Sequence, residues 1–426
     1  MLYKPGYFTG FRSDSPAQAI NQRFLRTAKA YLTSGNVKER VKMIKSYTAF
    51  TSEIDDVELA ASEILKQLEP EKNCLKSTVA VAVCYHEFAT NGIIAELYKK
   101  LNFPIIGTTS TAISTNRGLG QLDFSILMIT ADDVTFTAAC SSSLIDGLEK
   151  PFDQMYQSAL AGHSETPKLI ISAAPLMLNY AGDNYVDILS KVSNGVPNFG
   201  TLAIDNTSDY LDSYVMFNDK VERDIYGIIV ASGNINPKFL YASFSPEYIL
   251  AQTATITKAD GNLLKEIDGF PTIEYMEKMG LAENGKVSDI LHSIPFILDY
   301  AGEGVPVSRV LLSWNGDGYG ICGGLMPEGT KFSLGTWDKS DVLGTTVNTI
   351  KSILKNENIS TLILHSCLAR SYSLGAEILS ETEKVNETVA EKIPYIFSYA
   401  GGEICPVRDA ANSNSFHNNT VIACAF

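Results

Sequence analysis

The feature that most constrains the fold of this chain is an order of strand and helix signals that occurs twice. Thr78–Tyr85 is an apolar, β-rich run of the kind found in central strands. It is followed by a helical pattern at 91–101 and by strand signals at 103–110, 122–130 and 134–141. The second occurrence has a strand at 168–174, a helix at 185–192, and strands at 196–200, 213–217 and 226–232. Strands that alternate with helices predict an α/β fold.

Two residues hold the same place in both occurrences. Pro104 and Gly107 match Pro197 and Gly200, and the members of each pair are 93 residues apart. Two matched residues can arise by chance, but the shared order of elements favours a duplication. We therefore interpret residues 35–245 as one domain, a pseudo-duplicated β/α unit.

A different pattern begins near Pro246. Here Pro271 marks the start of a helix at 272–279, and Ser340 is expected to cap a later helix that carries Leu343, Val347 and Ile350. Strands are predicted at 252–258, 263–267, 309–314, 331–334, 361–364, 395–399 and 420–426. We expect a second, mixed-sheet α/β domain over residues 246–426. Residues 1–34 are expected to form an N-terminal helical extension.

Charge and composition narrow the classes of function. The chain of 426 residues is 45% hydrophobic and carries a formal charge of −14. A nucleic-acid binder needs a basic surface to neutralise phosphates, so we expect no nucleic-acid partner. No apolar run approaches the length of a membrane span, and Met1–Tyr7 lacks the apolar core of a signal peptide. The seven cysteines are scattered singly, as is typical of reduced thiols, and we expect a cytoplasmic protein with no membrane partner.

The candidate site lies where the strand at 362–364 gives way to a helix predicted to begin at Ser373. His365, Ser366, Cys367 and Arg370 fall between these two elements. In open α/β sheets, ligands bind at the carboxyl ends of strands, and a helix N-terminus attracts anions. Two later segments are expected to join this site, and their candidate residues are Gly402, Glu403, His417 and Asn418.

Arg370 and Glu403 suggest a ligand with two charges. The planar guanidinium of Arg370 suits a carboxylate, and Glu403, which follows two glycines, suits an ammonium group. Together they would bind an amino acid or a small carboxylate. The alternative is that Arg370 forms a structural ion pair, for which Glu403 itself is a candidate partner.

Cys367 has two interpretations. With His365, His417 and Glu403 it would complete a nucleophile and base of a cysteine-dependent enzyme acting on a small amide or ester. No hydrolase signature surrounds it, and buried cysteines are usually inert, so we expect no catalysis and a role in lining the ligand site. The five histidines show no metal-ligand spacing, so no metal site is expected. The glycine-rich segment at 315–320 is interpreted as a hairpin turn.

Short pieces of the sequence also resemble a known family. They are Thr253–Thr257, Asp260–Gly261, Leu264–Gly269, Pro271, Glu328–Thr330, Ser366–Cys367 with Arg370, Gly402–Glu403 with Pro406, and His417–Asn418 with Thr420. In this order they resemble the C-terminal FIST domain, and residues 35–245 resemble the N-terminal FIST domain. Ala369 departs from the pattern, because the family usually has glycine before the arginine.

This resemblance implies a sensory protein that binds a small ligand, with amino acids as the usual suggestion. Some members are haem proteins that sense nitric oxide. We therefore expect no cofactor, with haem as the alternative. His365 and His417 are the candidate axial ligands of a haem. The output protein, a kinase, cyclase or chemoreceptor, would act in trans. The identity of the ligand, the partner, the oligomeric state and the location of the pocket stay open.

Overall fold

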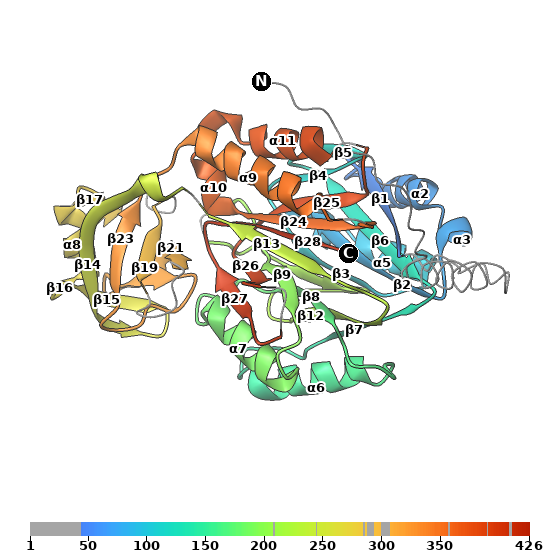
Figure 1. Cartoon of the computed structure of the whole chain (residues 1–426), viewed down its shortest axis with the longest axis horizontal. Helices are drawn as coiled ribbons and strands as arrows, with labels where there is room; N and C mark the ends of the chain where they lie inside the picture. The colour runs from blue at the N-terminus through green and yellow to red at the C-terminus, as the bar shows by residue number, and fades with distance from the viewer. Residues whose placement is uncertain are drawn as a thin grey trace, which may run out of the picture. The chain divides into compact units, whose positions relative to one another are not determined.

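The computed structural model describes residues 44–426 apart from 208, 244, 284–285, 288–293, 300–306, 357, 390 and 409–410. The described residues form three six-stranded sheets and a separate eight-stranded sheet, with helices packed on the sheets (Figure 1). The α/β class predicted from the sequence is confirmed. The N-terminal extension predicted over residues 1–34 lies outside the described residues.

The three six-stranded sheets share one pattern of strand pairing. Their orders are β1-β6-β2-β3-β10-β11, β7-β12-β8-β9-β26-β27 and β13-β28-β24-β25-β4-β5. In each sheet the third and fourth strands are parallel, and every other neighbouring pair is antiparallel. The predicted duplication is therefore confirmed, and the pairing extends it to a third repeat that the sequence did not reveal.

Each repeat contributes four strands to its own sheet and a hairpin to another. The four-strand sets are Lys45–Thr51 (β1), Ser77–Cys84 (β2), Ile105–Thr109 (β3) and Phe124–Ala131 (β6); Val134–Cys140 (β7), Leu169–Ala174 (β8), Asn198–Leu202 (β9) and Gly227–Gly233 (β12); and Lys238–Ala242 (β13), Leu362–Cys367 (β24), Tyr395–Ala400 (β25) and Val421–Ala425 (β28). The hairpin strands are Ile113–Thr115 (β4), Gly118–Gly120 (β5), Val215–Phe217 (β10), Lys220–Glu222 (β11), Glu403–Pro406 (β26) and Asn414–His417 (β27).

The hairpins are exchanged in a cycle. The hairpin of the first repeat completes the third sheet, that of the second completes the first sheet, and that of the third completes the second sheet. Close to the point of exchange, the amide of Gly401 donates to Leu202 O at 3.0 Å, and the amide of Ile204 donates to Thr109 O at 3.2 Å. The exchange therefore links the three sheets through the backbone itself.

The matched glycines have the same environment in the first two repeats. A Cβ atom at Gly107 would lie 2.3 Å from Ala82 O, and one at Gly200 would lie 2.3 Å from Ser172 O. Both glycines are needed because the neighbouring parallel strand approaches closely at this point. In the third repeat the same register position is Phe397, which explains why the sequence match did not extend to it.

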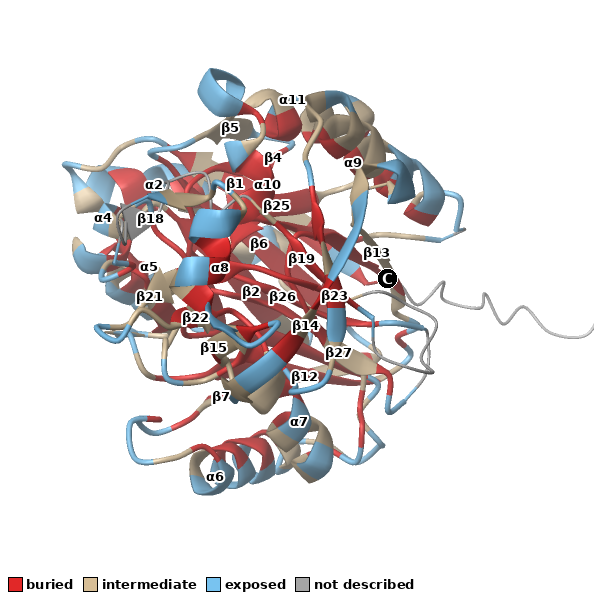
Figure 2. Cartoon of the chain, turned by 90° about the vertical axis from the view of Figure 1, so that its left-hand side faces the viewer, coloured by how far each residue is buried: buried red, intermediate tan, exposed pale blue. Residues whose placement is uncertain are grey.

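The sheets share a core and carry helices on their outer faces. The core joins Val81 and Leu127 of the first sheet to Ile171 of the second and to Ile363 and Ile422 of the third. The helices are Val57–Leu68 (α2), Pro70–Asn73 (α3), His86–Thr90 (α4), Ile93–Leu101 (α5), Glu149–Leu160 (α6), Gly182–Val192 (α7), Lys339–Ile353 (α9), Leu368–Tyr372 (α10) and Ser380–Val389 (α11). Figure 2 shows buried residues on the strands and on the inner faces of helices such as α6.

An inserted unit of residues 249–335 interrupts the third repeat between β13 and α9. Its elements are Ile249–Asp260 (β14), Leu263–Ile267 (β15), Phe270–Pro271 (β16), Thr272–Lys278 (α8), Ala282–Glu283 (β17), Lys286–Val287 (β18), Phe296–Asp299 (β19), Val307–Arg309 (β20), Leu311–Trp314 (β21), Gly320–Cys322 (β22) and Lys331–Gly335 (β23). The segment at 315–320 joins β21 to β22 as a hairpin. The unit has its own apolar core, which includes Ile256, Phe296 and Phe332.

The sheets do not follow the expected division at residues 245 and 246. Strand β13 pairs with β28 in the third sheet, and β26 pairs with β9 in the second. The ranges 35–245 and 246–426 stay a prediction about domains.

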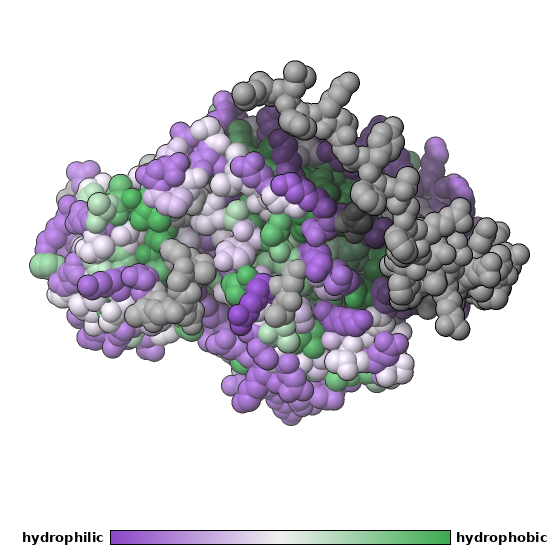
Figure 3. Space-filling model, viewed as in Figure 1, coloured by the Kyte–Doolittle hydropathy of each residue, from purple (hydrophilic) through white to green (hydrophobic). Residues whose placement is uncertain are grey.

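Figure 3 shows hydrophilic and hydrophobic residues interspersed on the face seen in Figure 1.

Two local predictions were wrong. Asp338, not Ser340, caps α9, because its carboxylate accepts bonds from the amides of Ser340 and Asp341. The helix after β24 begins at Leu368 rather than Ser373, because the backbone turns directly after Cys367.

Candidate functional site

Strand β24 sends its predicted site residues to opposite faces. His365 stacks on Phe199 with ring centroids 5.5 Å apart, on the side of the core shared by the sheets. Ser366 faces the helices on the outer side, where it bonds to Glu381 of α11 at 3.1 Å. Because side chains alternate along a strand, these neighbours cannot line one pocket. Cys367 is the last residue of the strand, and its side chain lines a pocket.

Arg370 forms a structural ion pair. Its Nη2 atom lies 3.2 Å from Glu381 Oε1, and both side chains are completely buried. The guanidinium also donates to Val342 O at 2.9 Å, to Thr346 Oγ1 at 2.9 Å and to the Ser366 hydroxyl at 3.0 Å. The structural alternative is thus observed, with Glu381 in the place suggested for Glu403. Glu381 neutralises the charge of Arg370, although the Arg370 Nη1 atom has no hydrogen-bond partner among the described residues.

The two candidate haem ligands do not fit an axial role. His365 Nδ1 lies 2.8 Å from Ser398 Oγ, and His417 Nε2 lies 3.0 Å from Cys405 O. Burial lowers the pKa of His365 to about 3 and that of His417 to about 4. His417 is stacked on Tyr241, and neither histidine is among the residues that line the pocket at Cys367. Both rings belong to packed cores.

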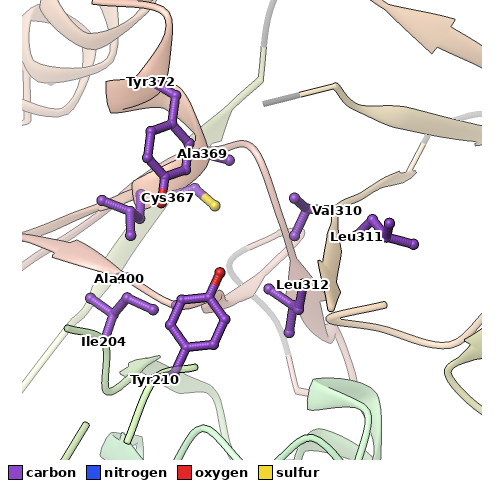
Figure 4. Close-up of a pocket in the computed structure, with 11 residues that line it drawn as sticks. Ile204, Tyr210, Val310, Leu311, Leu312, Cys367, Ala369, Tyr372 and Ala400 are labelled. Atoms are coloured by element: carbon purple, nitrogen blue, oxygen red, sulfur yellow. The ribbon is translucent and has the colours of Figure 1, made fainter. Parts of the chain in front are cut away.

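A pocket lies at the carboxyl end of β24, and the space within it, open solvent included, is about 280 Å³. Figure 4 shows the Cys367 sulfur and the Tyr210 hydroxyl directed into the same space, with Val310 and Leu312 on its other side. The lining is mostly apolar and comes from two repeats and the inserted unit. The lining residues are Ile204, Tyr210, Val310, Leu311, Leu312, Cys367, Leu368, Ala369, Tyr372, Ala400 and Gly401.

Cys367 is a neutral thiol in this setting. Burial raises its pKa well above the ordinary value, and the neighbouring Glu403 carboxyl raises it further, although the backbone amides of Asn419 and Ala369 oppose this shift. A nucleophilic cysteine needs a lowered pKa. The His365 ring stacks on Phe199 and bonds to Ser398, and it does not line the pocket that Cys367 lines, so it is not placed to act as the base. The arrangement suits a residue that lines a ligand site.

Glu403 lies behind Cys367 and is completely buried. Its Oε2 atom accepts bonds from the Thr420 hydroxyl at 2.8 Å and the Thr420 amide at 3.4 Å. The Cys367 thiol approaches the same carboxyl as a weak donor, and Oε1 has no other hydrogen-bond partner among the described residues. Burial raises the pKa of Glu403 to about 8, so the carboxyl is mainly protonated at neutral pH.

Asn418 and Gly402 adjoin Glu403. The Asn418 side chain is completely buried, and both of its polar atoms lack partners among the described residues. A Cβ atom at Gly402 would lie 2.4 Å from the Phe416 ring and 3.3 Å from Asn418 Nδ2. The absence of a side chain at Gly402 therefore lets these residues pack against the backbone beside the pocket.

Of the lining residues, sequence reasoning predicted only Cys367, and those it missed include Ile204, Tyr210 and Tyr372. The first two come from the second repeat, where the Asp205 carboxylate fixes the loop through the Asp212 amide at 2.9 Å and the Ser213 hydroxyl at 2.8 Å. Tyr210 has a left-handed backbone, with φ of 57°. A tyrosine in that conformation is unusual, but only the structure reveals it.

Family comparison identifies the chain. The model described as FIST N domain matches residues 78–269, and the one described as FIST C domain matches residues 274–406. This chain belongs to the FIST family. FIST domains are generally sensory domains that bind small ligands in signal transduction and signal to partner proteins. The resemblance seen in the sequence is confirmed.

Comparisons with solved structures and with curated proteins gave weaker matches or none. The fold of this FIST protein is similar to a crystal structure of cyanuric acid hydrolase from A. caulinodans, with 8% sequence identity and a TM-score of 0.36. The similarity covers 91% of this chain and 99% of that one, and at this level it carries no argument about function. A search of curated proteins found no match. Among the described residues, no helix has the length and apolar character needed to cross a membrane.

Proposed function

We propose that this FIST protein is a sensory protein whose small ligand binds in the pocket at Cys367. The observation that carries the proposal is the juxtaposition of an apolar pocket with a buried polar group. Cys367 lines the pocket and contacts the buried Glu403 carboxyl, whose Oε1 accepts no nitrogen or oxygen donor from the part of the chain that the structure describes. Ligand sites in proteins typically combine an apolar wall with a few placed polar groups.

The wall favours a small ligand with an apolar body. Ile204, Val310, Leu312 and Leu368 form apolar parts of the lining. The space inside this lining is about 280 Å³ with open solvent included, which favours a small ligand over a large cofactor such as haem.

The polar groups favour an amino acid over a plain carboxylate. The hydroxyls of Tyr210 and Tyr372 can donate to a carboxylate. The lining contributed by the described residues contains no lysine or arginine, and Arg370 is paired with Glu381. A carboxylate that enters without a cation would be costly to desolvate. An amino acid brings its own ammonium group, so we propose this class, with related carboxylates binding more weakly.

We also propose that a separate kinase, cyclase or chemoreceptor reads the bound state. Helix α10 supplies Leu368, Ala369 and Tyr372 to the pocket, and the Arg370 side chain of the same helix bonds to α9 and α11. A ligand that moves α10 would therefore change how these outer helices are held. This is a route from the pocket to a surface on which a partner can act.

A thermal-shift screen of amino acids and matched carboxylates tests the proposal. A ligand at 100 times its dissociation constant should add about 2.7 kcal/mol to the free energy of unfolding. Leu312→Trp, which fills the pocket, and Tyr372→Phe should reduce the shift, whereas Tyr248→Phe, outside the pocket, should not. The proposal fails if no compound shifts the melting temperature or if Leu312→Trp leaves the shift unchanged.

A further inference from the structure

The three repeats show that the fold does not require a carboxyl group at residue 403. In each sheet an amide of the fourth strand bonds to the residue before the exchanged hairpin: Leu202 to Gly402, Thr109 to Tyr214, and Tyr399 to Ala112. The next residues are therefore equivalent, and they are Glu403, Val215 and Ile113. Val215 and Ile113 are buried and apolar. A buried ionisable group in place of an aliphatic one is costly, so its presence points to a role beyond folding.

Four buried polar atoms near this carboxyl have no nitrogen or oxygen partner among the described residues. They are Glu403 Oε1, Asn418 Oδ1, Asn418 Nδ2 and Asn419 Oδ1. The three side chains are completely buried. Buried polar atoms are hydrogen-bonded in the great majority of cases, so a group of four without partners indicates that something else occupies this place.

These atoms belong to one cluster that adjoins the pocket. Glu403 bonds to Thr420, which follows Asn418 and Asn419 in the chain. The Asn418 amide lies between two glycines, since a Cβ atom at Gly323 would be 2.9 Å from its Oδ1 and one at Gly402 would be 3.3 Å from its Nδ2. Cys367 contacts the Glu403 carboxyl on one side and lines the pocket on the other. Cys367, which contacts Glu403, and Gly401, which precedes Gly402 in the chain, both line the pocket, so the cluster lies next to it.

We propose that Glu403, Asn418 and Asn419 form a subsite for a nitrogen group of the ligand that carries at least two N–H donors. Three of the four free atoms are oxygens, and one is an amide nitrogen. A primary ammonium offers three N–H donors for three oxygens, and a primary carboxamide offers two donors and one acceptor. The inference rests on the proposed function, because it assigns one end of the ligand that occupies the pocket.

The charge of Glu403 distinguishes an ammonium from a carboxamide. Burial raises the pKa of this carboxyl to about 8, and a bound cation would lower it again. Binding of an ammonium near pH 7 should therefore release a proton from Glu403, and binding of a neutral carboxamide should not. The nearby charged and titratable groups are Arg370, whose charge is paired with Glu381, and the Cys367 thiol, which stays neutral.

The test is calorimetric titration of the full chain with probes that share one apolar body. The probes are leucine, 3-methylbutylamine, 3-methylbutanamide and 3-methylbutanoate, each titrated at pH 7 in two buffers of different ionisation enthalpy. We expect at least one nitrogen-bearing probe to bind at least about tenfold more tightly than 3-methylbutanoate, as for a hydrogen bond to a charged group. Proton release with leucine or the amine would identify an ammonium subsite, whereas tightest binding of the amide, with no proton release by any probe, would identify a carboxamide subsite.

Variants separate the subsite from the pocket. Glu403→Gln and Asn418→Ala should each weaken the preferred probe at least about tenfold, and Glu403→Gln should abolish any proton release. Asn198→Ala is the control, because Asn198 is also buried with an Nδ2 that has no partner among the described residues, but its Oδ1 accepts a bond from Ser172 and it is not part of the proposed subsite. Circular dichroism verifies that each variant is folded. Binding of leucine that is lost in Leu312→Trp but unchanged in Glu403→Gln and Asn418→Ala would overturn the subsite and leave the proposed function intact. Absence of binding by every probe would overturn both.

Discussion

Where the second strand of the first repeat and its counterpart in the third repeat end, the two repeats share a backbone and differ in their side chains. Cys367 of the third repeat donates its amide to Thr420 O at 2.9 Å, as Tyr85 of the first donates to Asp123 O at 2.9 Å. A five-residue helix follows in both, α10 and α4. Counted from these bonds, Arg370 of α10 is equivalent to Phe88 of α4, which is completely buried in an apolar core. The same backbone therefore accepts either an ion pair or an aromatic ring at this place.

The difference shows where function can be separated from folding. The first two repeats demonstrate what the fold needs, namely strand pairing, close glycines and apolar filling. Polar groups that occur only in the third repeat, such as Glu403 and Arg370, are not required by the backbone pattern. Burying such groups is energetically costly, and they lie near the pocket. We therefore expect the function to reside in the third repeat.

The largest effect is expected from breaking the ion pair that replaces the aromatic ring. Arg370→Ala leaves Glu381 buried without its partner, which should lower the free energy of unfolding by about 3–5 kcal/mol. The double substitution Arg370→Met with Glu381→Leu should recover most of this loss, because an apolar pair resembles the first repeat. Urea denaturation measures both values. A double variant as unstable as Arg370→Ala would contradict the equivalence with Phe88.

The matched glycines test whether the first two repeats are energetically alike. Gly107→Ala and Gly200→Ala each place a Cβ atom 2.3 Å from a backbone oxygen, and each should cost about 1–3 kcal/mol. Gly344→Ala in α9 is the control, because nothing lies within 4 Å of its Cβ position, and it should stabilise by about 0.5–1 kcal/mol. Thermal unfolding compares the three variants. Strongly unequal costs at the two glycines would show that the repeats have diverged in packing.

Glu403 should make stability depend on pH in a way that its apolar counterparts cannot. Its folded pKa is about 8 and its ordinary value is 4.5, so between these values the folded state holds a proton that the unfolded state has released. Stability therefore falls as pH rises, by about 1.4 kcal/mol per pH unit and about 2 kcal/mol between pH 6.5 and pH 8. Glu403→Gln and Glu403→Val should remove this slope.

The measurement is the free energy of unfolding against pH, taken as the difference between wild type and variant. Below pH 6.5 the buried His365 and His417 act in the opposite sense, because their folded pKa values are lowered. Stability from this source rises with pH up to about 6.5. Comparison with the variants cancels the histidine contribution. An identical slope in wild type and Glu403→Gln between pH 6.5 and pH 8 would show that Glu403 is ionised in the folded protein.

The smallest effect concerns helix caps in the first and third repeats. The Asp56 carboxylate accepts a bond from the Leu59 amide at 3.0 Å, and Asp338 accepts one from the Ser340 amide at 2.9 Å. Substitution of either aspartate by alanine should cost about 1 kcal/mol. Ser340→Ala, at the residue predicted from the sequence to be the cap, should cost less. Urea denaturation of the three variants decides which residue caps α9.

The sequence by itself determined the elements whose signals are local. The strand at β2, the helix at α5 and the β/α order of the first two repeats were predictable, because apolar periodicity and turn residues act over a few positions. The strand that ends at Cys367 was also found, since an apolar run before a polar segment marks it. The helix start there was misplaced by five residues, because local propensity does not fix where a buried strand turns.

Only the tertiary structure decided the relations among distant segments. The inserted unit hides the third repeat by placing residues 249–335 between β13 and α9. The exchange of hairpins puts Glu403 on a sheet of the second repeat, and the pocket draws Tyr210 and Val310 from segments far from Cys367. Glu381 pairs with Arg370 from a separate helix. These contacts form because burial and hydrogen bonding select partners in space, and a single sequence carries no local mark of which distant residue will be the partner.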